Sequence, residues 1–283
     1  MSMSSTIWIW RKVSGLIGRY NDVLYACPTL LHSNEFLIFF GGDIQDLQKN
    51  MMKNAEKRKY IEWSLDNTTR LLSHNFPKYH VFVICPSRIS NVFSCFDNFV
   101  KCNEYGIPTF SSTFNALKNL QELVRSFCAK LNILNVNQDT TYSPDKINLT
   151  LMAFSKGCVV LNQFLHEFQY YQSQTIPDNS IMNFINCIKS MWWLDCGHGG
   201  YKDTWITDKN ILELFSKLNI EVHVHVTPYQ IQDTRRPWIA DEESAFYKTL
   251  KSLNVPIQRT VHFENKPRSI IMHFNLLKII RGT

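Results

Sequence analysis

Residues 147–165 read INLTLMAFSKGCVVLNQFL, and this stretch decides the fold. Its first part, from Ile147 to Phe154, is an apolar run of the length and composition typical of a buried strand. From Gly157 onward, apolar residues recur at the three- and four-residue spacing of an amphipathic helix. The stretch therefore predicts a strand, a tight turn at Ser155 and a helix.

The turn has the pattern of a nucleophile elbow, in which a serine lies at a strained turn between a strand and a helix. Small residues are needed two positions before and two positions after that serine, so that strand and helix can approach closely. Ala153 and Gly157 meet this need, with alanine in place of the usual first glycine. We expect Ser155 to be a nucleophile, and the alternative is an ordinary turn between a strand and a helix.

Short β-rich apolar runs alternate with longer amphipathic stretches along the rest of the chain. Strands are predicted at 23–26, 36–40, 80–85, 147–154, 190–194, 221–227 and 258–263, and helices at 52–74, 113–132, 157–172, 178–188, 208–217 and 240–253, with a closing helix at 274–280. This alternation is typical of an α/β fold with a mostly parallel sheet flanked by helices. Together with the serine turn, it predicts an α/β-hydrolase-like domain.

Composition limits the classes of function. The chain has 283 residues, of which 45% are hydrophobic and 19% charged, so it can bury a large core. A net charge of +6 without long basic stripes does not indicate nucleic-acid binding. The eight cysteines are scattered without a CxxC pair, as in reduced intracellular proteins. No dinucleotide, Walker or HExxH motif occurs in the sequence, so we expect no cofactor.

The amino-terminal segment differs from the rest. Residues 1–21 contain no acidic residue and mix serine and basic residues with aromatic ones, which resembles a weak mitochondrial presequence. The alternative is a basic segment that packs its aromatic side chains on the domain. We therefore divide the chain into this segment and a single domain at residues 22–283. A basic cluster between Lys49 and Lys59 would suit either peripheral membrane contact or a solvated helix face.

The acid and the base of a catalytic triad should follow the serine in the order Ser, acid, His. Asp233 follows the predicted strand 221–227, and His273 follows the last predicted strand. Asp195, at the end of strand 190–194, is the rival acid, and Asp233 also has arginines nearby in the sequence with which it could pair. We favour Asp233 on chain order, and His273 over His262, which falls inside a predicted strand.

Backbone amides must stabilise the oxyanion of an acyl-transfer reaction. Lys156, which follows the serine, and the Gly42-Asp43 turn after strand 36–40 are the predicted donors. The alternative for the second is an ordinary turn at the end of a strand. A rival zinc site would use Cys196, His198, His223 and His225, but their spacing matches no standard zinc signature. We therefore expect no metal.

Several longer segments carry a resemblance to a known family: Phe39–Asp43, Phe93–Lys101, Phe154–Gln163, Trp193–His198 and His225–Gln230. On these segments the chain resembles the chromosome 2 open reading frame 69 family, which is α/β-hydrolase-like and associated with mitochondria. The resemblance implies an α/β-hydrolase fold, a mitochondrial location (with the cytoplasm as the alternative) and the position of a nucleophile for Ser155. It implies no substrate.

These observations favour a serine hydrolase that acts on a small acylated substrate, an ester or thioester, through Ser155, His273 and Asp233. The rival hypothesis comes from another class of function: a noncatalytic scaffold with the hydrolase fold that binds a protein partner. The two share one architecture, so only the site separates them. The sequence does not indicate an oligomeric state.

Overall fold

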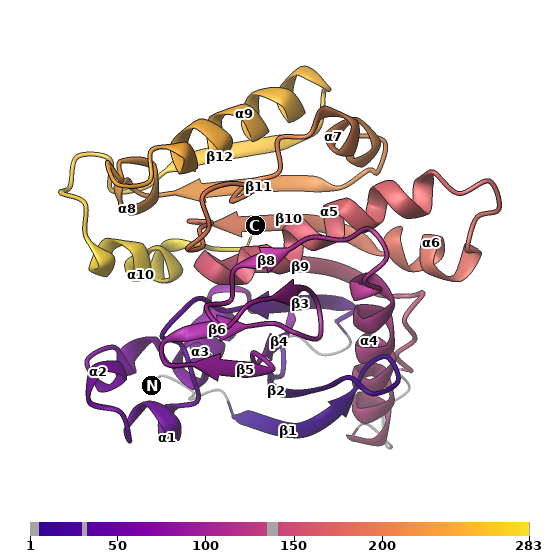
Figure 1. Ribbon diagram of the computed structural model, residues 1–283. Coiled ribbons are helices and arrows are strands. Elements are labelled where there is room, and N and C mark those ends of the chain that lie inside the picture. Colours follow the sequence, from indigo (N-terminus) through magenta and orange to yellow (C-terminus); the bar gives the residue numbers. More distant parts are fainter. Residues whose placement is uncertain (1–5, 30–32, 135–140, 283) are drawn as a thin grey trace.

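The computed structural model describes residues 6–29, 33–134 and 141–282. Its centre is an eight-stranded sheet in the order β1-β2-β4-β3-β9-β10-β11-β12 (Figure 1). These strands are β1 (Ile7–Ser14), β2 (Tyr20–Ala26), β3 (Glu35–Phe40), β4 (His80–Ile84), β9 (Asn148–Phe154), β10 (Ile188–Leu194), β11 (Glu221–Val226) and β12 (Ile257–Val261). β1 and β2 pair antiparallel, as do β2 and β4, and all the other neighbours in the sheet are parallel. The predicted mostly parallel sheet is confirmed.

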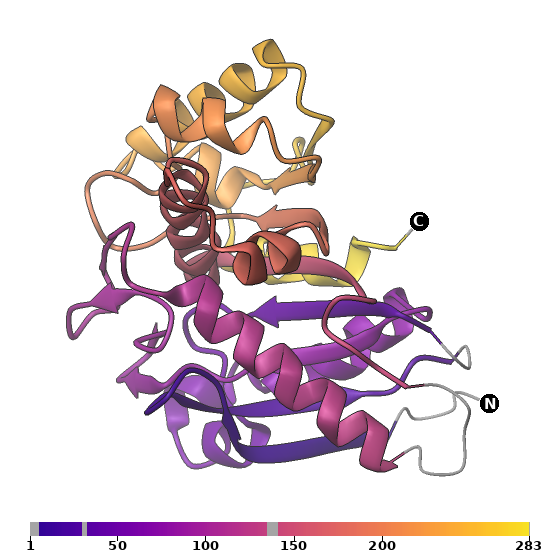
Figure 2. The ribbon, with the colours of Figure 1, turned by 90° about the vertical axis from the view of Figure 1, so that its right-hand side faces the viewer.

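The helices cover both faces of this sheet. They are α1 (Gln48–Met51), α2 (Ala55–Arg58), α3 (Leu65–Asn75), α4 (Ala116–Leu134), α5 (Cys158–Gln172), α6 (Asn179–Ile185), α7 (Lys209–Phe215), α8 (Pro228–Ile231), α9 (Trp238–Ser252) and α10 (Ile270–Ile279), with short 3-10 turns η1 (Ile61–Trp63) and η2 (Ser155–Gly157). α4 crosses the sheet over its antiparallel end (Figure 2). None of the helices described has both the length and the apolar character needed to cross a bilayer.

Two hydrophobic cores lie on the two faces of the sheet, because successive side chains of a strand point to opposite faces. In β3, Phe36, Ile38 and Phe40 join the core under α4, α5, α7 and α9. Leu37 and Phe39 join the second core, which is covered by α3 and α10. β3 is buried along almost its whole length, as expected for a central strand of a parallel sheet covered on both sides.

The chain between β4 and α4 forms two small hairpins outside the main sheet. They consist of β5 (Arg88–Ser90) with β6 (Phe93–Cys95), and β7 (Lys101–Cys102) with β8 (Pro108–Thr109). Figure 1 shows these hairpins in front of β3 and β4, in magenta. The sequence does not predict them, since each strand is too short to show an alternating pattern.

Two further predictions differ from the structure. The helix predicted at 52–74 is interrupted, because Ser64 caps the start of α3 by accepting a hydrogen bond from the Asn67 amide. β1 lies inside the amino-terminal segment that we separated from the domain, yet it is the edge strand of the sheet, and Trp10 stacks on Tyr25 at 4.7 Å. The boundary at residue 21 is therefore not a structural one. Residues 1–5 lie outside the described part of the chain.

Candidate active site

Ser155 follows β9, the central strand, and occupies a strained backbone position. Its φ of 53° lies in the left-handed region, which residues other than glycine seldom adopt. The chain continues through η2 directly into α5. A Cβ atom added to Gly157 would lie 2.2 Å from the carbonyl oxygen of Phe40, so only glycine allows this approach to the end of β3. The sequence therefore forces a sharp turn that leaves Ser155 at the carboxyl end of the sheet.

Asp195 follows the neighbouring strand at the equivalent position. β10 pairs with β9 so that Leu194 lies opposite Phe154, and the next residues are Asp195 and Ser155. The side chain of Asp195 is fully buried. Its Oδ1 accepts a hydrogen bond from the Thr227 amide at 2.7 Å, and its Oδ2 accepts one from the Thr227 hydroxyl at 2.5 Å. These contacts fix the carboxylate in one orientation.

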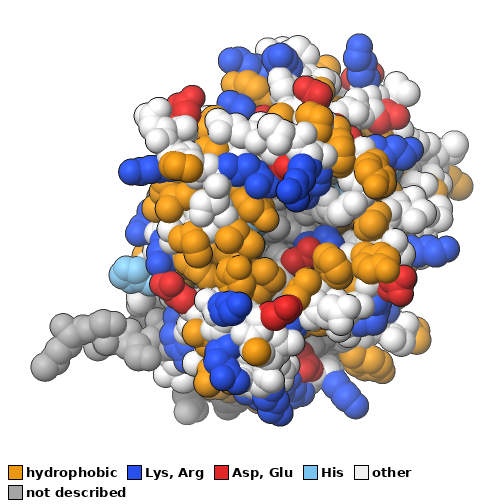
Figure 3. Space-filling model, turned by 60° about the vertical axis from the view of Figure 1, so that its left-hand side comes forward, with side chains coloured by type: hydrophobic (Ala, Val, Ile, Leu, Met, Phe, Trp, Pro, Cys, Tyr) orange, Lys and Arg blue, Asp and Glu red, His pale blue; other side chains and the backbone are white. Residues whose placement is uncertain are grey.

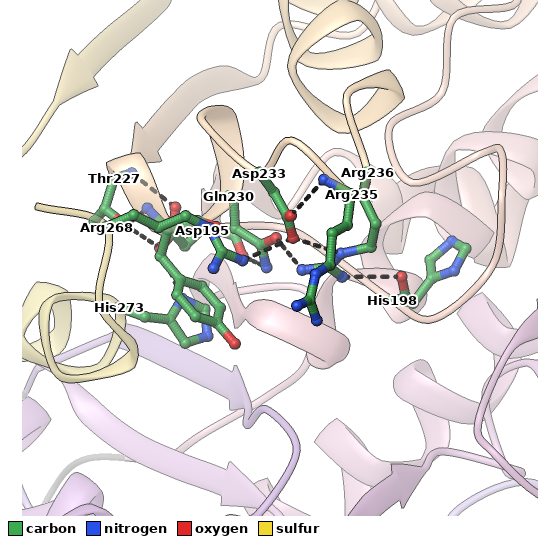
Figure 4. A network of polar contacts seen from close by, with 10 residues as sticks. Asp195, His198, Thr227, Gln230, Asp233, Arg235, Arg236, Arg268 and His273 are labelled. Atoms are coloured by element: carbon green, nitrogen blue, oxygen red, sulfur yellow. Dashed lines mark hydrogen bonds and ion pairs between the residues drawn. The ribbon is translucent and has the colours of Figure 1, made fainter.

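His273 completes the group from α10. Its Nδ1 lies 2.7 Å from Asp195 Oδ2, and its side chain is almost completely buried. The ring lies between two aromatic neighbours, with centroids 4.4 Å from Phe154 and 4.6 Å from Tyr229. Packing and the carboxylate hold this imidazole with Nδ1 toward Asp195. Among the described residues, Ser155 included, no hydrogen bond to Nε2 is found. Figure 4 shows His273 beside Asp195.

Asp233 is elsewhere, and the prediction that it orients His273 is wrong. Thr227 caps α8, which carries the chain away from the end of β11 before Asp233 is reached. The Asp233 carboxylate binds Arg236 at 2.8 Å and Arg268 at 2.7 Å instead, and it also accepts a hydrogen bond from the amide of Arg235 (Figure 4). Both aspartates satisfy the chain order Ser, acid, His, so chain order could not separate them.

Ser155 and His273 line the same small cavity, of about 160 Å³. It opens on the face formed by the carboxyl ends of the parallel strands. Figure 3 shows this face hollowed near its centre, with hydrophobic side chains beside the hollow and Lys or Arg side chains above it. The lining comes from the turn after β3, the first small hairpin, the loop after β10, α8 and its following turn, and α10: Asp43, Ile44, Phe93, Ser155, Gly197, His198, Gly199, Tyr229, Gln230, Arg236, Ile270, His273 and Phe274.

The turn after β3 lies directly against Ser155. A Cβ added to Gly42 would lie 2.8 Å from the Ser155 Cβ, which explains a glycine there. The Gly42 amide donates to Gln45 Oε1 at 2.8 Å, so it is already engaged, and the prediction of Gly42 as an oxyanion donor is wrong. By contrast, the Asp43 amide has no acceptor among the described residues. Lys156 lies within the first turn of η2, where amides have no partner inside the helix.

The side chains of Asp43 and Lys156 join this turn to the serine turn. The Lys156 side chain is buried, and its Nζ lies 3.2 Å from Asp43 Oδ2 and donates to the Tyr105 carbonyl at 2.9 Å. The other carboxylate oxygen of Asp43 accepts a hydrogen bond from the Ser94 amide. Burial raises the pKa of Asp43, and the Lys156 cation opposes this rise. The ion pair thus links the turn after β3 to the serine turn, and it helps to fix the position of the Asp43 amide relative to the Lys156 amide.

Three residues at or next to the cavity have a left-handed backbone conformation. Ile44, Ser155 and Asp195 have φ values of 73°, 53° and 48°. For a β-branched residue such as Ile44 this conformation is especially unfavourable. Strained residues of this kind persist where the surrounding structure determines them, and they cluster at functional sites. Ile44 and Ser155 line the cavity, and Asp195 contacts His273, which also lines it.

The rival zinc ligands are divided among separate partners. Cys196 Sγ contacts the Thr204 carbonyl, and His223 pairs with Glu221 and stacks on Trp192. His225 Nδ1 lies 2.8 Å from the ring nitrogen of His262, which was the rival base. The part of the chain that the structure describes holds no cluster of three or more residues suited to a metal ion.

His198 is the one member of that set that lines the cavity. Its Nδ1 accepts a hydrogen bond from the Gly200 amide at 3.0 Å, and its Nε2 lies 3.2 Å from the Asp203 carbonyl. Burial lowers the pKa of His198 to about 4, so the ring is neutral at pH 7. Both ring nitrogens are engaged, which makes it a structural residue of the cavity wall.

Four residues around the site have no place in the predicted triad or oxyanion hole. Thr227 fixes Asp195, Tyr229 packs on His273, and Arg236 and Arg268 bind Asp233. The alternative that Asp233 pairs with a neighbouring arginine, Arg235 or Arg236, is confirmed for Arg236. No pattern in the sequence indicates that residue 268, far along the chain, joins the same group.

Comparisons with known proteins agree with this architecture. The chain is similar to the esterase Est22 solved with p-nitrophenol, at 12% identity over 99% of this chain and 78% of that one, with a TM-score of 0.54. A second structure of Est22 gives 13% identity, coverage of 98% and 76%, and a TM-score of 0.53. At such identities the likeness concerns the fold alone, and that fold is the α/β-hydrolase fold predicted from the sequence.

Relatives of higher identity indicate the family. The chain is 34% identical to the mitochondrial protein C2orf69 homolog of Danio rerio, over 92% of this chain and 81% of that protein. It is 33% identical to the mitochondrial protein C2orf69 of Homo sapiens, over 86% and 73%. Both names support the mitochondrial location that the resemblance implied. The C2orf69 family model matches residues 10–142 and 131–256. This chain therefore belongs to the C2orf69 family.

Proposed function

We propose that this chain is a serine hydrolase that cleaves a small ester or thioester with Ser155, His273 and Asp195. The observation that carries the proposal is the buried Asp195–His273 contact of 2.7 Å at a cavity that Ser155 also lines. A nucleophile, a base and a buried group that orients the base form the recurring unit of nucleophilic catalysis.

In the first half of the reaction, Ser155 Oγ attacks the carbonyl carbon and its proton passes to His273 Nε2. Asp195 stabilises the imidazolium that forms, through the hydrogen bond from Nδ1. The amides of Asp43 and Lys156 are the candidate donors to the oxyanion, and each such donor typically contributes about 100- to 1000-fold in rate. The C–O or C–S bond then breaks, and the leaving group takes the proton from Nε2.

In the second half, water attacks the acyl carbon of the acyl-serine and gives a proton to His273 Nε2. The bond between the acyl carbon and Ser155 Oγ breaks, the proton returns to the serine, and the carboxylic acid leaves. A cavity of about 160 Å³ suits a short acyl group rather than a long chain. Ile44, Phe93 and Phe274 give its wall an apolar part that would contact such a group.

Hydrolysis of p-nitrophenyl acetate by the full chain tests the proposal. We expect Ser155→Ala to reduce turnover to background, while the control Ser252→Ala, at the exposed end of α9, retains wild-type turnover. Equal rates for wild type and Ser155→Ala would contradict the proposal. That result would favour the noncatalytic alternative, in which the same face binds a protein partner.

A further inference from the structure

A second cavity, of about 490 Å³, adjoins the candidate active site. Six residues line it: Tyr229, Asp233, Thr234, Arg235, Arg236 and Arg268. Two of these, Tyr229 and Arg236, also line the cavity of Ser155 and His273. The Tyr229 ring contacts both sides of this junction, with its centroid 4.6 Å from the His273 ring and 4.7 Å from the Arg268 guanidinium carbon. The Tyr229 ring therefore lies between Arg268 and the candidate base.

The charges in this second cavity do not balance. Three guanidinium groups face a single carboxylate, Asp233, since no other acidic residue lines the cavity among those described. Arg236 and Arg268 both bind the same oxygen of that carboxylate, Oδ2. An arginine side chain does not lose its proton in proteins, so a net charge of +2 remains.

Other contacts hold two of the arginines in place. The Nη atoms of Arg236 contact Gln230 Oε1 at 3.3 Å and the His198 carbonyl at 3.5 Å. The Nε of Arg268 donates to the Tyr229 carbonyl at 2.9 Å. A binding group fixed before the ligand arrives loses less conformational entropy when it binds.

Asp233 supports this arrangement from a buried position. Burial by itself would raise the pKa of Asp233, but the hydrogen bond and charge of Arg236, with the charge of Arg268, lower it. The carboxylate is therefore ionised at neutral pH and holds the two arginines. Arg235 is different, because it is exposed and its guanidinium has no partner among the described residues. Figure 4 shows Arg235 and Arg236 next to Asp233.

We propose that this arginine cavity binds an anionic group of the substrate, a phosphate or carboxylate, while the scissile ester or thioester lies at Ser155. The planar guanidinium fork of arginine matches two oxygens of either anion. This inference rests on the proposed hydrolase function and narrows the substrate to an acyl compound that carries such an anion. The role of Asp233 is to position the arginines.

Two pairs of substrates distinguish where the anion resides. The first pair differs by a carboxylate on the acyl side: p-nitrophenyl hemisuccinate and p-nitrophenyl butyrate. The second pair differs by a phosphate on the leaving group: the acetyl thioesters of phosphopantetheine and of pantetheine. In each pair, the ratio of kcat/KM for the anionic over the neutral compound measures recognition of the anion. We expect the wild-type ratio to exceed 1 in at least one pair.

The variant Arg235→Ala removes the unpaired guanidinium and leaves the Asp233 ion pairs. We expect it to lower the ratio for the preferred pair about tenfold, as the loss of one charge-assisted hydrogen bond does. Arg125→Ala, an exposed arginine of α4 paired with Glu122, is the matched control and should leave the ratio unchanged. A ratio that is the same in wild type and Arg235→Ala for both pairs would overturn the proposal.

A binding measurement separates failure of this inference from failure of the hydrolase function. Inorganic phosphate should raise the Tm of the full chain more than sodium chloride of equal ionic strength, and Arg235→Ala should reduce this increase. Phosphate also stabilises folded proteins without binding them, so the comparison of variants decides. If no ester is hydrolysed but Arg235→Ala reduces the phosphate-dependent rise in Tm and Arg125→Ala does not, the anion site stands and the hydrolase function fails. If phosphate and chloride act equally on the wild type, the anion site is refuted whatever the activity.

Discussion

Replacing Asp195 by asparagine should abolish turnover by forcing the wrong tautomer on His273. The Thr227 amide can only donate, so the asparagine oxygen must take the place of Asp195 Oδ1. The asparagine NH₂ then occupies the place of Oδ2, where it faces His273 Nδ1 at the present distance of 2.7 Å. The Thr227 hydroxyl can rotate and accept a hydrogen bond from this NH₂, but the imidazole must turn its unprotonated nitrogen toward it.

The proton of the imidazole then resides on Nε2, which can no longer accept the proton of Ser155. The same substitution in the serine-protease triad lowers kcat about ten-thousand-fold, and we expect a loss of that order. Asp233→Asn is the matched comparison, since it changes one buried carboxylate of the same face. It should lower the turnover of a neutral ester far less than Asp195→Asn does, because Asp233 binds arginines and contacts neither Ser155 nor His273.

The assay is hydrolysis of p-nitrophenyl acetate by both variants, with circular dichroism to verify that each is folded. We expect the hydrolysis rate of Asp195→Asn to be near background and that of Asp233→Asn to be near the wild-type rate. The reverse ranking would refute the assignment of Asp195 as the residue that orients His273.

Two further predictions concern the framework of the site, and a third concerns a buried histidine of the core. Gly157→Ala should lower the free energy of unfolding by about 2 kcal/mol or more, because its Cβ would lie 2.2 Å from the Phe40 carbonyl oxygen; urea denaturation measures this. Lys156→Met should raise the pKa of Asp43 further, since burial already raises this pKa and the substitution removes the cation that opposes the rise. The turn after β3 should then be displaced from Ser155, and kcat for p-nitrophenyl acetate should fall about tenfold or more. Burial lowers the pKa of His80 to about 4, so between pH 6.5 and pH 4 the unfolded chain binds a proton at this histidine more readily than the folded chain does. The free energy of unfolding should therefore decrease as the pH is lowered through this range, and His80 should contribute a loss of about 1 to 2 kcal/mol at pH 5. Urea denaturation at pH 7 and at pH 5 measures this loss. Unchanged unfolding of Gly157→Ala, unchanged kcat of Lys156→Met, or equal stability at the two pH values would each contradict the corresponding argument.

The fold was predictable because its signals are local. The apolar run before Ser155, the small residues around it and the helical spacing after it all lie within one short stretch. His273 was predictable from its place after the last strand. These features depend on neighbouring residues and on the order of elements along the chain.

The parts that could not be predicted depend on which strands are neighbours and on how loop side chains fold. Asp195 orients His273 because β10 lies next to β9 and because Thr227, which follows β11, fixes the carboxylate. Gly42 is not free because the side chain of Gln45 folds back onto its amide. Neither contact leaves a pattern in the sequence, since each depends on the three-dimensional course of a loop.

Labelling by a fluorophosphonate tests directly whether Ser155 is an activated nucleophile, because this reagent reacts with an activated serine and not with ordinary serines. The folded full chain is treated with the reagent, and the modified residue is identified by peptide mass spectrometry. We expect modification at Ser155, absent in Ser155→Ala and strongly reduced in Asp195→Asn. Folded wild-type protein that remains unmodified at Ser155 would contradict this expectation.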